Sequence, residues 1–129
     1  MTARLRSAVL LAGLLLAGCR PAADTSDTID LAWTVSPETP AAGSATFDIR
    51  LKDKASGRPV TGATVKLEGD MTHPGMQPVF STAREASPGR YHAAMRFTMS
   101  GDWVILLDAT LADRRTVHRQ MDLRGVRVP

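Results

Sequence analysis

Residues 91–111, YHAAMRFTMSGDWVILLDATL, decide the fold class because they contain two runs in which every second residue is apolar. The apolar positions of the two runs are Tyr91, Ala93, Met95, Phe97 and Met99, then Trp103, Ile105, Leu107, Ala109 and Leu111. Gly101-Asp102, between the runs, is typical of a turn. Side chains of a β-strand alternate between two faces, so each run predicts a strand with one face on a core.

The same alternation continues on both sides of this stretch. It predicts further strands over residues 29–35, 45–51, 63–67, 79–83 and 117–123, with turn residues between them. No segment has a convincing helical period, and there are no internal repeats. About seven strands in about 100 residues are typical of an immunoglobulin-like antiparallel β-sandwich, here predicted over residues 28–127. The cysteine pair of true immunoglobulin domains is absent, so only the architecture is expected.

The first 18 residues predict a lipoprotein signal peptide. Arg4 and Arg6 precede an apolar run of roughly ten residues, too short for a membrane span of about 20. The run ends in Leu16-Ala17-Gly18-Cys19, which resembles a lipobox. We therefore expect cleavage before Cys19, acylation of that cysteine, and a tether over residues 19–27. Arg20, in place of aspartate, favours the outer membrane, with the domain facing the periplasm. An ordinary signal peptide with a chance cysteine is the alternative.

Charge and cysteine content exclude several function classes. The chain has 16 basic and 13 acidic residues, and loss of Arg4 and Arg6 with the signal leaves 14 against 13, a net charge of +1. The charges alternate without a basic block, which argues against nucleic-acid binding. Cys19 is the only cysteine, so the mature domain has no disulfide and no thiolate ligand. No paired carboxylates, Gly-x-Ser-x-Gly motif or phosphate loop is present, so we expect no enzyme.

Residues 69–78, GDMTHPGMQP, contain the candidate chemistry. Pro74-Gly75 suits a type II turn, which would bring His73 and Met76 close together. Met71 precedes His73 by two residues and would lie on the same side of an extended chain. Two thioethers and an imidazole favour Cu(I) over zinc, calcium or magnesium. The sequence thus predicts a Cu(I) site of Met71, His73 and Met76, and a copper donor or acceptor protein as a partner.

Met99 is a possible fourth ligand, and whether it lies near the His73 loop depends on the topology. Methionine on an inward strand face is usually core, and we assign Met95 and Met121 to packing. A histidine in a turn is often only solvated, and His92 and His118 fall on outward positions. A metal-free interaction module and a structural envelope protein therefore stay open as alternatives.

Three motifs in the chain resemble the YtkA-like family, which is related to the periplasmic part of FixH. They are Met71-x-His73-Pro74-Gly75-Met76, Gly89-x-Tyr91, and Phe97-x-Met99-x-Gly101-x-Trp103, within residues 29–123. The resemblance implies an immunoglobulin-like sandwich at the cell envelope, with a role in copper supply or oxidase assembly. It also implies that the methionine and histidine residues of the first motif are the metal segment, with Met99 a possible addition, and that Tyr91 and Trp103 are structural.

Two features of the chain depart from these relatives. FixH is anchored by a transmembrane helix, whereas this chain has a lipobox. The fold also looks similar to that of CopC-like copper carriers, whose mature N-terminal histidine is absent here because the mature chain would begin at acylated Cys19. We therefore do not expect Cu(II) binding of that kind.

Overall fold

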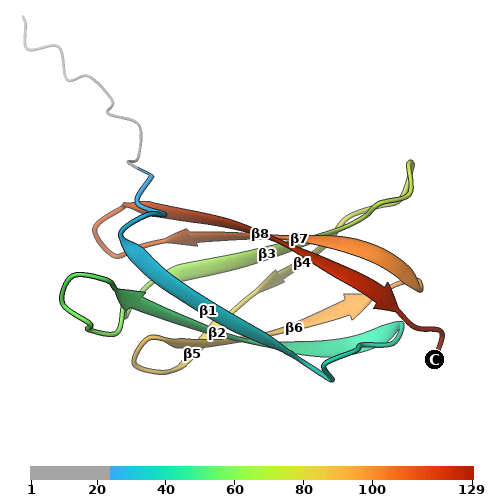
Figure 1. Cartoon of the computed structure of the whole chain (residues 1–129), viewed down its shortest axis with the longest axis horizontal. Coiled ribbons are helices and arrows are strands. Elements are labelled where there is room, and N and C mark those ends of the chain that lie inside the picture. Colours follow the sequence, from blue (N-terminus) through green and yellow to red (C-terminus); the bar gives the residue numbers. More distant parts are fainter. Residues whose placement is uncertain (1–23) are drawn as a thin grey trace, which may run out of the picture.

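The computed structural model describes residues 24–129, and the predicted signal peptide, Cys19 and the first part of the tether lie outside the described residues. The described chain forms eight strands: β1 (Ile29–Ser36), β2 (Gly43–Asp53), β3 (Thr64–Met71), β4 (Val79–Thr82), β5 (Arg84–Ser87), β6 (Arg90–Phe97), β7 (Gly101–Thr110) and β8 (Thr116–Val126). Two four-stranded antiparallel sheets face each other, which confirms the predicted all-β sandwich (Figure 1). In residues 24–129 no helix is long and apolar enough to span a membrane.

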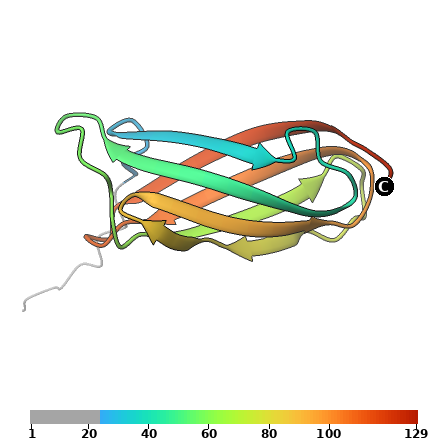
Figure 2. The same cartoon turned by 90° about the horizontal axis from the view of Figure 1, so that it is seen from below.

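The strand order is β1-β2-β6-β5 in one sheet and β4-β3-β7-β8 in the other. The two strands of the 91–111 stretch, β6 and β7, thus belong to different sheets, and the turn between them crosses from one layer to the other (Figure 2). β7 lies between β3 and β8 and pairs with β3 from Thr64↔Thr110 to Met71↔Trp103. The end of β3 therefore lies beside the start of β7.

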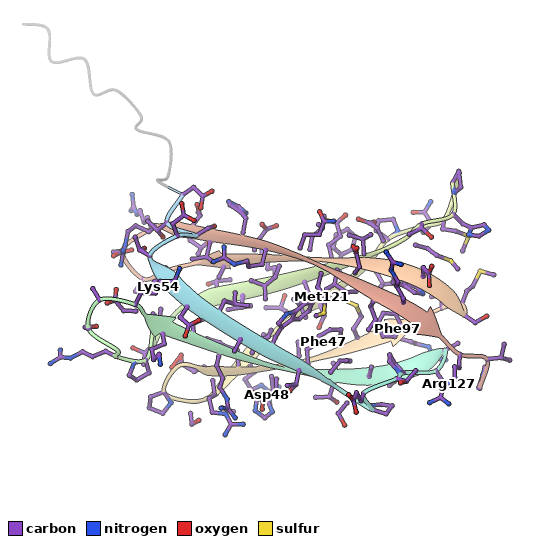
Figure 3. All side chains as sticks on the ribbon, viewed as in Figure 1. Phe47, Asp48, Lys54, Phe97, Met121 and Arg127 are labelled. Atoms are coloured by element: carbon purple, nitrogen blue, oxygen red, sulfur yellow. The ribbon has the colours of Figure 1, made fainter. Side chains whose placement is uncertain are left out.

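The inward residues of both sheets form one hydrophobic core. Its largest side chains are Trp103, Tyr91, Phe47 and Phe97. Phe97 contacts Trp103 edge-on with ring centroids 5.2 Å apart, and Phe47 lies 6.4 Å from Phe97. Figure 3 shows Phe47 and Phe97 between the two sheets. Both sheets and this core are formed by residues 24–129.

The predicted strand over residues 79–83 is confirmed as β4, but a further short strand, β5, follows it in the other sheet. β4 pairs with β3, and β5 pairs with β6. The crossing occurs at Ala83, whose N–H donates to the Val65 carbonyl at 2.8 Å. All four residues of β5 are exposed, and none is a large apolar residue, so hydrophobic alternation does not reveal this strand. The sandwich consequently has eight strands where about seven were expected.

The described chain begins at one end of the sandwich. Residues 24–27, which the sequence assigns to the tether, are bonded to the domain: Asp24 bridges Thr116, and the Thr25 N–H donates to the Thr116 carbonyl at 2.8 Å. Thr116 pairs with Thr110, at the end of β7 opposite Trp103. The β3–β4 loop is therefore at the far end of the sandwich from Asp24 (Figure 1).

Candidate metal site at the sandwich rim

The β3–β4 loop, residues 72–78, projects beyond the ends of the sheets (Figure 1). Its first residue is fixed to the start of β7. The Thr72 N–H and hydroxyl both donate to the Asp102 carbonyl, at 3.1 and 3.3 Å. Met71, the last residue of β3, is the register partner of Trp103. The base of the loop is thus tied to β7, while its tip extends into solvent.

The predicted Pro74-Gly75 turn forms at the tip of this loop. Gly75 has a φ of 81°, which confirms the expected positive torsion. A Cβ added at Gly75 would meet no atom within 4 Å, so the turn does not pack against the rest of the domain. His73 and Met76, which flank the turn, are both exposed. A ligand in solution can therefore approach both side chains.

Met99 lies in the β6–β7 turn, beside the base of the β3–β4 loop. The Thr72–Asp102 hydrogen bonds join the two segments, and the Trp103 Nε1–H donates to the Met99 carbonyl at 3.2 Å. The Met71 side chain lies against the same turn, since a Cβ added at Gly101 would be 2.7 Å from Met71 Cε. The topology that the sequence left open thus places the segments of Met71 and Met99 side by side.

The methionines of the described chain divide into packing and accessible residues. Met95 is in the core, and Met121 is partly buried against it, as expected. Met71 is half-buried and also packs against the core. Met76 and Met99 are 36% and 47% exposed. The thioethers of Met76 and Met99 are therefore accessible and lie outside the hydrophobic core, and Met71 lies at the margin of that core.

Exposed apolar side chains gather at the same end, which the sequence did not single out. The large hydrophobic residues that are exposed in residues 24–129 are Met76, Phe80, Met99 and Val128. Phe80 is 69% exposed on β4, next to the loop, and Val128 follows Val126, which pairs with Gly101. Phe80 occupies an outward-facing position of β4. An aromatic residue at such a position of the predicted strand could have identified it from the sequence.

Histidines and carboxylates elsewhere form pairs on the outer faces of the sheets. His92 Nε2 is 3.2 Å from Asp48 Oδ2, and His118 Nδ1 contacts Asp108. Both histidines are exposed, as predicted. Within the described chain no group of three or more His, Cys, Asp or Glu side chains is arranged to hold a metal ion.

Tyr91 and Trp103 have the structural roles that the resemblance implied. Both rings are buried, and their polar atoms are bonded. The Tyr91 hydroxyl donates to the Val60 carbonyl at 2.7 Å and accepts from the Ala63 N–H at 3.1 Å. Burial raises the pKa of Tyr91 to about 12, and the negative charge of Glu85 acts in the same direction.

Residues 23–108 match the YtkA-like family. The chain belongs to this family. The match includes the rim segments and ends within β7, so β8 lies outside it. No curated protein matches the sequence significantly.

Two solved structures resemble the YtkA-like domain. A DUF4426-family protein from Pseudomonas aeruginosa PAO1 has a TM-score of 0.57 at 9% identity, covering 79% of this chain and 93% of its own. The PmoD soluble domain from Methylocystis sp. ATCC 49242 (Rockwell) has a TM-score of 0.49 at 16% identity, covering 73% and 89%. The first similarity shows a shared fold, and neither one identifies a ligand.

Proposed function

We propose that this YtkA-like domain binds Cu(I) at the methionine rim, defined as Met71, His73 and Met76 together with Met99. The supporting observation is the pairing of the end of β3 with the start of β7, which brings the two methionine-bearing segments together. His73, Met76 and Met99 are exposed and do not serve the core.

The donor chemistry of the rim fits this metal. Thioether sulfur and neutral imidazole are soft ligands that suit Cu(I), while calcium and magnesium prefer oxygen. Thioethers also cannot form disulfides, which makes them suitable in an oxidising compartment. The ligand side chains are accessible and lie on two adjacent segments, which suits transfer of the bound metal to a second protein. We therefore propose a carrier or reservoir for copper in the envelope, and no catalytic step.

A Cu(I) titration against a chromophoric chelator tests this function. The domain of residues 20–129, which contains both sheets and the core, should retain one Cu(I) per chain. His73→Ala and Met76→Ala should each weaken affinity by at least about tenfold, the loss that even an outer-shell change causes in metal sites. Both residues are exposed, so thermal melting should stay unchanged.

Met121→Leu is the matched control, because Met121 is a methionine that packs against the core. Its Cu(I) affinity should equal that of the unchanged domain. Absence of retained copper at micromolar metal would refute the proposal. Equal losses of Cu(I) affinity in Met121→Leu and Met76→Ala would also refute it, because the loss would then not be specific to the methionine rim.

A docking function at the same rim is the second candidate, and the exposed Phe80 favours it. Exposed aromatic and aliphatic side chains beside the candidate ligands could contact a copper donor or acceptor protein. Phe80→Ser should leave Cu(I) affinity unchanged and reduce the capture of envelope proteins by the tagged domain. Two results together would favour a metal-free module. Capture of envelope proteins would depend on Phe80 but be the same with and without copper, and His73→Ala would not change metal retention.

We further propose that Cys19 is acylated and anchors the domain to the envelope membrane. The supporting observation is the Leu16-Ala17-Gly18-Cys19 motif after a short apolar run. Cells grown with labelled palmitate should yield a labelled protein, and Cys19→Ala should abolish the label. Label that persists in Cys19→Ala would exclude this cysteine as the acylated residue.

A further inference from the structure

The outer faces of the two sheets carry opposite charge. On the sheet β1-β2-β6-β5, the charged outward residues are Arg50, Lys52, Arg84, Arg90 and Arg96 against Asp30 and Asp48, a formal net charge of +3. On the sheet β4-β3-β7-β8 they are Lys66 and Arg124 against Glu68, Asp70, Asp102, Asp108 and Asp122, a net charge of −3. The net charge of the domain is therefore close to zero although its two outer faces carry opposite charges. We call the first surface the basic face.

Asp48 lies at the centre of the basic face and is outnumbered by cations. Arg90 Nη2 is 2.7 Å from Asp48 Oδ2, and Arg50 Nε is 4.0 Å from Oδ1 of the same carboxylate. His92 also contacts Asp48, so one carboxylate serves two guanidinium groups and an imidazole. Figure 3 shows Asp48 on the side of its sheet that faces away from Phe47 and the core. Positive charge is consequently left uncompensated here.

Two further arginines of the basic face have no acidic partner. Within residues 24–129, neither Arg84 nor Arg96 has a carboxylate within 4.0 Å. Arg84 is the register partner of His92, and Arg96 lies four residues further along β6. Glu85, the neighbour of Arg84, is the register partner of inward-facing Tyr91 and accepts a hydrogen bond from the Gly62 N–H. Free cations thus extend along the strands of the face.

The remaining outward residues of the basic face are small or polar. Apart from His92, they are Ala32, Thr34, Ser36, Ser44, Thr46, Ser87 and Ala94, and all of them are exposed. Small side chains on the strands of a sheet make a broad, shallow surface without an apolar anchor. Such a surface suits an extended anionic plane better than a protein partner, whose contact core is normally apolar and aromatic.

We propose that the basic face docks on anionic phospholipid headgroups of the membrane to which the chain is tethered. Charge complementarity supports this, since juxtamembrane basic residues are attracted to anionic lipid surfaces. The length of the tether also permits it. Four residues separate Cys19 from Asp24, and the five Cα–Cα steps between them can span at most about 18 Å, more than the roughly 10 Å between packed sheets. Docking on lipid is independent of copper binding, and it uses the proposed anchor only to keep the face near the membrane.

Vesicle binding of the unacylated domain, residues 20–129, tests this proposal without the anchor. The domain should sediment with vesicles of phosphatidylcholine and phosphatidylglycerol in equal parts, and not with phosphatidylcholine alone. Binding should weaken as salt is raised, because ions screen exposed charges. Each basic side chain near such a surface strengthens binding about fivefold, so Arg84→Glu with Arg96→Glu should weaken it at least about 25-fold.

The matched control reverses two charges on the opposite face. Lys66→Glu with Arg124→Glu gives the same net charge and should bind the vesicles almost as well as the unchanged domain. Arg84→Gln with Arg96→Gln provides a milder pair in case the reversal disturbs folding, and circular dichroism checks each variant. Cu(I) affinity should be the same in all of them, which separates this result from the fate of the copper proposal.

Three outcomes would overturn lipid docking. The first is equal binding to anionic and neutral vesicles. The second is an equal loss in the two reversed pairs, which would mean that net charge alone governs binding. The third is salt-sensitive self-association without vesicles, because the basic face would then engage the acidic face of a second copy.

Discussion

Replacing Trp103 with alanine tests the packing at the place where the core meets the methionine rim. The indole is 1% exposed, and its ring contacts Phe97 edge-on at 5.2 Å. Removing a buried aromatic side chain costs about 3–5 kcal/mol in lost burial and cavity formation. A domain of this size has a free energy of unfolding of about 5–15 kcal/mol. Trp103→Ala should therefore remove a large share of the stability.

Urea unfolding followed by circular dichroism measures this loss directly. Trp103→Phe separates the two contributions of the side chain, since it keeps an aromatic ring but removes the Nε1–H that donates to the Met99 carbonyl. It should cost about 1–2 kcal/mol, mainly for the lost hydrogen bond and the smaller ring. Trp33→Phe is the matched tryptophan control, because Trp33 is only partly buried and stacks on Phe47.

The expected order of destabilisation is Trp103→Ala, then Trp103→Phe, then Trp33→Phe. A loss below about 1 kcal/mol for Trp103→Ala would refute the assignment of this ring to the core, because it would lie in the range of surface substitutions. A loss for Trp103→Phe as large as that for Trp103→Ala would instead show that the hydrogen bond to Met99 dominates. Either result would change the account of how the Trp103 side chain stabilises the domain.

Further stability predictions concern three positions. A Cβ at Gly69 would lie 2.9 Å from both Met95 Sδ and Val79 Cγ2, so Gly69→Ala should lower the free energy of unfolding by about 1–3 kcal/mol in a urea titration. Gly75→Val should cost about 1–2 kcal/mol through its positive φ alone, and an unchanged urea midpoint would contradict the turn. Because the Tyr91 pKa is about 12 when folded, unfolded Tyr91 ionises first as the pH rises. Stability should fall from about pH 10 to about pH 12 by up to roughly 1.4 kcal/mol per unit, and Tyr91→Phe should abolish this slope between about pH 10 and about pH 12.

The strands that bury one face could be predicted because burial imposes a period of two on the sequence. β6 and β7 show this most clearly, with every second residue in the core. β5 could not be found this way, since Arg84–Ser87 buries no side chain and is held by backbone pairing with β6. Alternation also tells which residues face inward without telling which sheet they belong to. The crossing between β6 and β7 therefore needed the structure.

The local geometry of the methionine rim could be predicted from the sequence, but the contact between its two segments could not. Pro74-Gly75 determines the turn, and the positive φ of Gly75 follows from residue type. The proximity of Met99 depends on which strand pairs with β3, a contact between residues about 30 positions apart. The opposite charges of the two outer faces also depend on the long-range pairing of strands. Each outward residue is visible in the sequence, but its assignment to one sheet is not.

The two proposed contacts predict different orientations of the domain on a membrane. Asp24 is bonded near Thr110 and Met71 lies beside Trp103, so the tether end and the methionine rim are separated by about 24 Å along β7. A tether alone would let the rim point in any direction, whereas docking of the basic face lays the sandwich along the membrane with its rim at the side. Charge reversal at Arg84 and Arg96 should therefore change how readily a membrane-bound acceptor removes Cu(I), while the affinity in solution stays the same. Unaltered transfer in that variant, despite lost vesicle binding, would mean that orientation does not govern delivery.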